Sequence, residues 1–172
     1  MPDQFAAVDG LAEGFQRRGG QLGLAYGIVA DGRLVSLDAR TGEPVTTFGD
    51  RGFVDLKAGV RGVDGPYMLE SPAVVYKNVV ITGGANTEGE PSLGLYGDIR
   101  GWDARTGRHL WSFHTVPRPG EPGVETWEGE SWKNRSGTNA WTYMTLDADR
   151  GLVFAGTGSP TSDFYGADRK GK

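Results

Sequence analysis

Short runs of apolar or alternating residues, separated by turn residues, dominate this chain. One run at 24–29 is followed by Asp31-Gly32 and a second run at 33–38. This arrangement predicts a β-hairpin, because Asp-Gly between two such runs is a strong signal for a tight hairpin turn. The same reading predicts further strands at 73–76, 79–82, 97–103, 141–147 and 151–156. The pattern therefore favours an all-β chain built from short strands.

The composition agrees with a folded, turn-rich chain. Glycine makes up 29 of the 172 residues, more than twice the usual share of roughly 7%. Glycine in a helix interior costs about 1 kcal/mol relative to alanine, so long helices are not expected. An aromatic content of 10%, with five tryptophans, argues against disorder. The absence of cysteine excludes disulfides, cysteine nucleophiles and thiolate metal sites.

Charge narrows the class of partners. The chain has 18 lysines and arginines against 22 aspartates and glutamates, which gives a net charge of −4. No cluster of lysines and arginines forms a basic face, and the basic tail Arg169-Lys170-Gly171-Lys172 is too short to change this, so nucleic-acid binding is not expected. No apolar run approaches the roughly 18–20 residues of a membrane span.

An internal repeat organises the chain. The segment 37–45 recurs at 102–111. In each copy a strand ends on an aspartate, a turn closes on glycine, and another strand is expected to begin after it. Aspartate can accept bonds from the amides of such a turn, and glycine can adopt the left-handed conformation that the turn requires. The predicted turns are 38–42, 103–107 and, in a looser copy, 147–151. Repeats of this kind predict propeller blades, with an inserted loop at 117–138.

The second repeat and the residues after it resemble one family. Asp103-Ala104-Arg105-Thr106-Gly107, followed by Trp111, is similar to the tryptophan-docking repeat of quinoprotein dehydrogenases. Those proteins are eight-bladed propellers that bind pyrroloquinoline quinone (PQQ) and calcium. The stretches 126–133, 136–141 and 156–160 resemble the cofactor-proximal segment of quinoprotein alcohol and glucose dehydrogenases. The resemblance implies about two to three blades of such a propeller, with 1–172 as an incomplete domain.

Several residues are candidates for the cofactor site. Trp141 matches the tryptophan on which the quinone ring stacks in the family, although a tryptophan packed between blades is the alternative. The glycine pairs near 83–84 and 156–158 mark strand ends where the backbone approaches a ligand closely. The candidate cofactor-binding residues are therefore Trp141, Gly84, Ala85 and Thr157.

The resemblance implies a weaker metal site. Ser159 stands where the family places a calcium-binding asparagine, and an ordinary turn before Pro160 is the alternative. Ser92 stands where the family carries a calcium-binding glutamate before Leu93-Gly94. The family's catalytic aspartate belongs to later blades, so no catalytic residue is expected in this chain.

The resemblance implies a fragment of a periplasmic PQQ-dependent dehydrogenase. Such an enzyme oxidises an alcohol or sugar hydroxyl by hydride transfer to the quinone, and passes electrons to a quinone or cytochrome c. By itself the chain is expected to be inactive, with partners in the remaining blades of the same propeller or in further copies of itself. The alternative is a non-catalytic propeller that uses the same repeats as a binding scaffold. Loss of the glutamate and asparagine ligands favours the scaffold, whereas the Trp127-to-Trp141 segment favours the enzyme.

Overall fold

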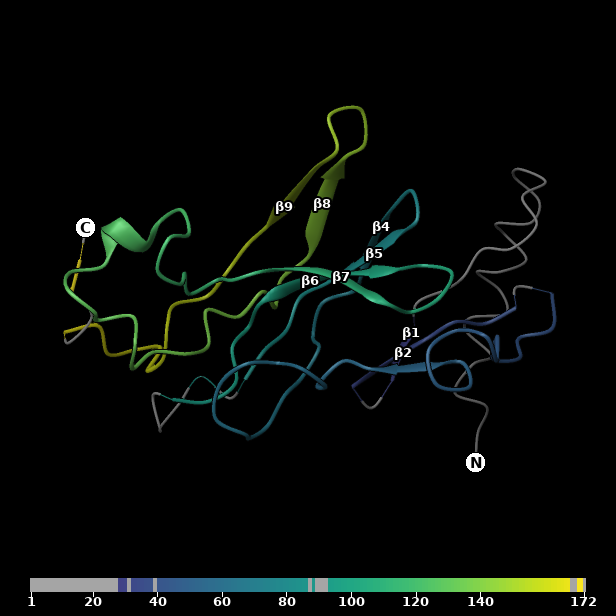
Figure 1. Cartoon of the computed structure of the whole chain (residues 1–172), viewed down its shortest axis with the longest axis horizontal. Coiled ribbons are helices and arrows are strands. Elements are labelled where there is room, and N and C mark those ends of the chain that lie inside the picture. Colours follow the sequence, from purple (N-terminus) through teal and green to yellow (C-terminus); the bar gives the residue numbers. More distant parts are fainter. Residues whose placement is uncertain are drawn as a thin grey trace.

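The computed structural model describes residues 28–30, 32–38, 40–86, 88, 93–167 and 170–171. Within these residues the chain forms nine short strands, arranged in three antiparallel sheets, and one turn of 3-10 helix (Figure 1). The described part contains no α-helix, and thus no helix capable of crossing a membrane. The predicted all-β class is confirmed.

The first sheet has three strands in the order β1 (Ile28–Ala30), β2 (Arg33–Val35) and β3 (Phe53–Asp55). β1 and β2 form the hairpin predicted around Asp31-Gly32, while 24–27 lie outside the described residues. The strand expected after Gly42 is not formed. Pro44 makes only an isolated bridge with Leu37, because proline has no N–H to donate to a longer ladder.

The second sheet is a four-stranded meander at the centre of the molecule (Figure 1). Its strands follow the order of the sequence, as in a propeller blade. They are β4 (Val74–Tyr76), β5 (Val79–Thr82), β6 (Ile99–Asp103) and β7 (His109–Phe113). A turn at Lys77-Asn78, between the predicted strands 73–76 and 79–82, joins β4 to β5.

The third sheet is a two-stranded hairpin of β8 (Met144–Asp147) and β9 (Leu152–Ala155). The strand predicted at 141–147 begins only at Met144, so Trp141 lies in the segment that leads into β8. The 3-10 helix, η1 (Val124–Thr126), lies within the predicted insertion at 117–138.

Two apolar clusters pack successive sheets against each other. The first joins the first sheet to the second through five buried side chains: Leu34, Phe48, Leu56, Val80 and Trp102. The second cluster joins the second sheet to the third sheet through Ile81, Ile99, Ala140 and Met144. Sheets stacked through successive clusters are the arrangement of propeller blades, which bury their faces against neighbours.

The two clear repeat turns have the bonding that the sequence predicts. Asp38 Oδ1 accepts the backbone N–H groups of Arg40 and Thr41 at 2.8 and 3.2 Å. Asp103 Oδ1 accepts the N–H groups two and three residues ahead at 3.0 and 2.9 Å. The closing glycines, Gly42 and Gly107, have φ angles of 75° and 72°. Both copies are therefore the same aspartate-capped turn.

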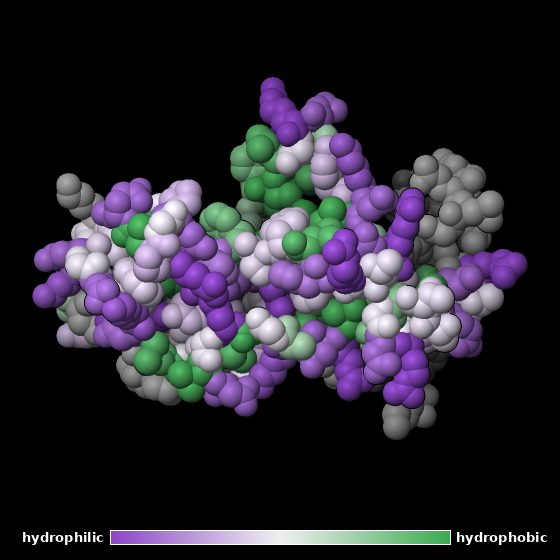
Figure 2. Space-filling model, viewed as in Figure 1, coloured by the Kyte–Doolittle hydropathy of each residue, from purple (hydrophilic) through white to green (hydrophobic). Residues whose placement is uncertain are grey.

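Large apolar side chains remain exposed on the third hairpin and on β7. Figure 2 shows an apolar group around the β8–β9 hairpin at the top of the view. The exposed side chains there are Tyr143, Leu152 and Phe154, and β7 adds Trp111 and Phe113.

Candidate cofactor site

Three segments that are far apart in the sequence meet around Asn139. Its side chain is completely buried, and its Oδ1 accepts the backbone N–H of Asn86, just beyond β5, at 3.0 Å. Its backbone carbonyl accepts the N–H of Gly158, just beyond β9, at 2.9 Å. Its Nδ2 donates to Glu88 Oε1 at 2.6 Å. Asn139 thus ties the chain after β5, before β8 and after β9 into one cluster, here called the Asn139 cluster (Asn86, Glu88, Asn139, Trp141 and Gly158).

Trp141 is the exposed aromatic residue of this cluster. Residues 135–140, which precede it, are all buried, whereas the Trp141 side chain is 48% exposed. A β-carbon added at Gly158 would lie 3.3 Å from Trp141 Nε1 and 3.4 Å from Glu88 Oε1. The indole N–H edge therefore lies beside Gly158, while about half of the side chain is open to solvent.

Gly84 and Ala85 lie beside the cluster, where the backbone is closely packed. A β-carbon at Gly97 would fall 2.9 Å from the Gly84 carbonyl oxygen and 2.5 Å from Asn139 Cα. Ala85 is buried and exchanges two backbone bonds with Met68, at 2.8 and 2.9 Å. Both residues can therefore offer a ligand little more than backbone.

Thr157 and Ser159 flank Gly158 and so lie at the rim of the cluster. Thr157 is exposed, and Ser159 is partly buried. The structure brings the segments carrying Trp141, Gly84, Ala85, Thr157 and Ser159 together. Their roles as ligands to a cofactor or metal remain predictions.

Glu88 is a member of the cluster that the sequence did not predict, as is Asn86. Ser92, the position compared with the family's glutamate, lies outside the described residues. Glu88 instead brings a carboxylate to the cluster from a position four residues earlier. Its backbone N–H donates to Asn86 Oδ1 at 2.9 Å in an Asx turn. The Asn-x-Glu spacing after β5 is the only local signal of this geometry.

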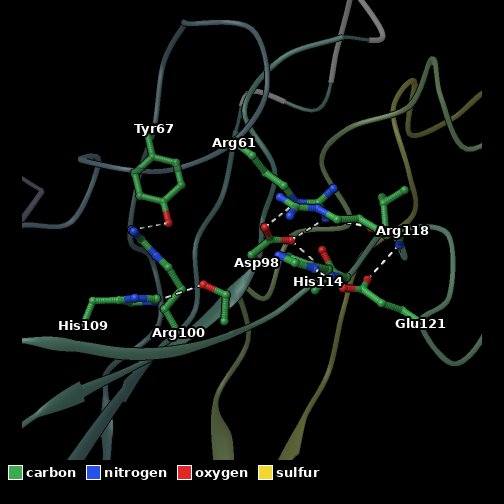
Figure 3. Close-up of polar contacts among 11 residues, drawn as sticks. Arg61, Tyr67, Asp98, Arg100, His109, His114, Arg118 and Glu121 are labelled. Atoms are coloured by element: carbon green, nitrogen blue, oxygen red, sulfur yellow. Dashed lines mark hydrogen bonds and ion pairs between the residues drawn. The ribbon is translucent and has the colours of Figure 1, made fainter.

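A partly buried ion pair lies beside the cluster on the side of β6. Arg61 donates to both carboxylate oxygens of Asp98, at 2.7 and 2.9 Å (Figure 3). The Arg61 guanidinium also lies 3.7 Å over the ring of Tyr96. Asp98 is only 5% exposed, and the next residue begins β6. Because Gly97 packs on Asn139, this bidentate pair fixes the chain at the edge of the cluster.

A second contact fixes the entry to the insertion. His114 Nδ1 and Glu121 Oε1 lie 2.6 Å apart, and the backbone N–H of Arg118 donates to Glu121 Oε2 at 2.7 Å (Figure 3). The Arg118 N–H is the main cause that lowers the pKa of Glu121, and His114 adds to it. The carboxylate therefore anchors the loop that leads toward Asn139.

The family model described as the β-propeller domain of PQQ glucose/ethanol/alcohol dehydrogenases matches residues 24–172. The chain belongs to this quinoprotein family. The match includes the whole Asn139 cluster and both repeat turns. It confirms the resemblance seen in the second repeat and after it, and with the three stacked sheets it confirms a partial propeller.

Curated relatives of the quinoprotein family agree with the match. Quinoprotein glucose dehydrogenase A of Acinetobacter calcoaceticus is 36% identical over 142 residues, which are 82% of this chain and 17% of that protein. The glycerol dehydrogenase large subunit of Gluconobacter oxydans (strain 621H) is 36% identical over 140 residues, 81% of this chain and 18% of that protein. Methanol dehydrogenase [cytochrome c] subunit 1 of Methylorubrum extorquens is 30% identical over 148 residues, which are 76% of this chain and 21% of that protein. The chain thus spans about a fifth of these relatives or less.

The quinoprotein family implies bound PQQ, and the cluster fits a planar quinone. The half-exposed indole of Trp141 offers an aromatic face beside a buried polar set. Stacking of two flat aromatic systems removes both faces from water in a favourable offset geometry.

Calcium fits the described residues less well. Calcium takes six to eight oxygen ligands, rich in carboxylates. The part of the chain that the structure describes holds no group of three or more acidic or histidine side chains placed to bind a metal. Glu88 would supply one carboxylate and Ser159 a hydroxyl, which is less negative charge than calcium sites in proteins usually contain.

Proposed function

We propose that this chain contributes the quinone platform of a PQQ-dependent dehydrogenase that oxidises an alcohol or sugar hydroxyl. The observation that carries the proposal is the half-exposed Trp141 ring beside the buried Asn139, within the stretch matched by the quinoprotein model. When bound, PQQ supplies the oxidising chemistry by accepting a hydride from the substrate carbon. The chain's own residues bind the quinone and orient it.

Each candidate residue has a part in this proposal. The Trp141 indole stacks on one face of the quinone and excludes water from it. Gly84 and Ala85 present backbone close to the ring, and the exposed Thr157 hydroxyl is a hydrogen-bonding group at its rim. Ser159 remains the proposed contact to a metal ion.

The rest of the activity is proposed to lie in other blades. The relatives are named for glucose, glycerol and methanol, and one is named for cytochrome c. By analogy with these relatives, we propose that the whole protein has an alcohol or sugar substrate, a quinone or cytochrome c as electron acceptor and a periplasmic location. The group that takes the substrate proton is not assigned to this chain, so the chain alone is proposed to be inactive.

The test is reconstitution of the full-length protein with PQQ and calcium. The proposal predicts that PQQ stays bound through gel filtration and that an artificial dye is reduced when an alcohol or aldose is added. The same preparation without PQQ is the control and is expected to reduce no dye. If no PQQ is retained at any metal concentration, the chain belongs instead to a propeller that serves as a scaffold.

A further inference from the structure

We propose that Glu88 is a positioning residue that fixes the Trp141 platform through Asn139. This inference rests on the proposed function of Trp141. Glu88 Oε1 lies 2.6 Å from Asn139 Nδ2, so the side chain of Glu88 accepts a short hydrogen bond from the Asn139 amide. Asn139 in turn lies two residues before Trp141, at the end of the buried run.

The orientation of the Asn139 amide is fixed from both sides. Its Oδ1 accepts the backbone N–H of Asn86 at 3.0 Å, so its Nδ2 must face the opposite way. There Nδ2 meets three acceptors: the Asn86 carbonyl at 3.2 Å, Asn86 Oδ1 at 3.3 Å and Glu88 Oε1. Because the amide presents N–H groups to the carboxylate, Glu88 acts here as an acceptor that holds an asparagine.

The backbone on both sides of this bond is in a restricted conformation. Glu88 has a φ of 60°, and Thr138, immediately before Asn139, has a φ of 52°. Non-glycine residues rarely adopt this left-handed region, and such residues persist where surrounding contacts determine them. The Asp163 N–H donates to the Glu88 carbonyl at 3.1 Å, which adds a further tie to the Glu88 backbone.

The platform and the carboxylate share one contact point at Gly158. A β-carbon there would approach both Trp141 Nε1 and Glu88 Oε1, at 3.3 and 3.4 Å, which is tighter than ordinary packing. Glycine at this position lets the indole edge and the carboxylate lie against the same stretch of backbone.

The test compares variants of the full-length protein by titration with PQQ, followed by quenching of tryptophan fluorescence and without substrate. Glu88→Ala is expected to weaken PQQ binding about three- to tenfold, because Asn139 loses its anchoring acceptor. Glu88→Gln is expected to stay within about twofold of wild type, since its amide oxygen accepts the same bond. Glu43→Ala, at an exposed glutamate of the first repeat turn, is the matched control.

A Glu88→Ala protein that binds like wild type would overturn the inference. So would a Glu88→Gln protein as weak as Glu88→Ala, because the charge and not the positioning bond would then matter. If Glu88→Ala does not fold, Glu88→Asp decides: it keeps a carboxylate but draws it back by one CH2 group from Asn139 Nδ2, so binding should weaken, and unchanged affinity would contradict the inference. Failure of wild type and Glu43→Ala to bind PQQ would instead count against the proposed function itself.

Discussion

Gly84 lies where the hydroxyl of Tyr67 fills the space that a β-carbon would need. That hydroxyl accepts a bond from Arg100 Nη2 at 3.4 Å (Figure 3). Burial raises the pKa of Tyr67, against the smaller lowering effect of the Arg100 charge, so Tyr67 stays neutral at ordinary pH. Glycine at this position is thus explained by a packed tyrosine as well as by the proposed cofactor.

Gly84→Ala is predicted to destabilise the full-length protein by about 1–3 kcal/mol, as overpacking in a closed site does. Adding Tyr67→Phe is expected to recover part of this loss, because removal of the hydroxyl relieves the closest contact. Urea unfolding of the two single variants and the double variant measures both effects. Strictly additive losses would show that the two residues do not compete for this space.

Trp141 and Glu88 differ in how far they can be predicted from the sequence. Trp141 was predictable because it follows a specific Gly-Thr-Asn run that resembles the family. Glu88 was not, because its contact with Asn139 joins residues 51 positions apart and depends on how β5 and β8 are placed. The resemblance to the family points to Ser92, whereas the fold brings the Glu88 carboxylate to Asn139.

Among the elements, the aspartate-capped turn is the feature that the sequence predicts in most detail. Residue types alone determine it, since Asp103 accepts bonds from residues only two and three positions away. The short strand β3 was not predicted, because three residues at 53–55 carry too little pattern. Pro44 also shows that a repeated turn does not guarantee a repeated strand.

The Asp103 turn gives a prediction of how thermal stability depends on pH. The backbone N–H of Thr106 is the main cause that lowers the pKa of Asp103 below its usual 3.8, and the Thr106 hydroxyl and the Arg105 N–H add to it. A carboxyl with a lowered pKa in the folded state stabilises the fold above its usual pKa, and this stabilisation is lost as pH falls through the lowered value. The thermal midpoint of Asp103→Asn should therefore lie below that of wild type at about pH 6, and the difference should shrink below about pH 4. A difference independent of pH would contradict this account.

At the scale of the whole molecule, three stacked sheets form part of a propeller. The central sheet has all four strands of a blade and is covered on both sides by apolar clusters. The third sheet has only the two strands β8 and β9 in the described residues, and it exposes Leu152 and Phe154. The chain spans 17–21% of the length of these two relatives. Together with the exposed apolar faces, this supports the proposal that further blades complete the ring.

The central claim is that Trp141 is the surface on which the quinone rests. The most direct measurement is the affinity of the full-length protein for PQQ in wild type, Trp141→Ala and Trp141→Phe. Phe113→Ala, at an exposed aromatic of β7, is the control. The account predicts that Trp141→Ala weakens binding at least about tenfold, that phenylalanine restores part of the affinity and that the control binds like wild type. Equal affinity of Trp141→Ala and wild type would contradict it.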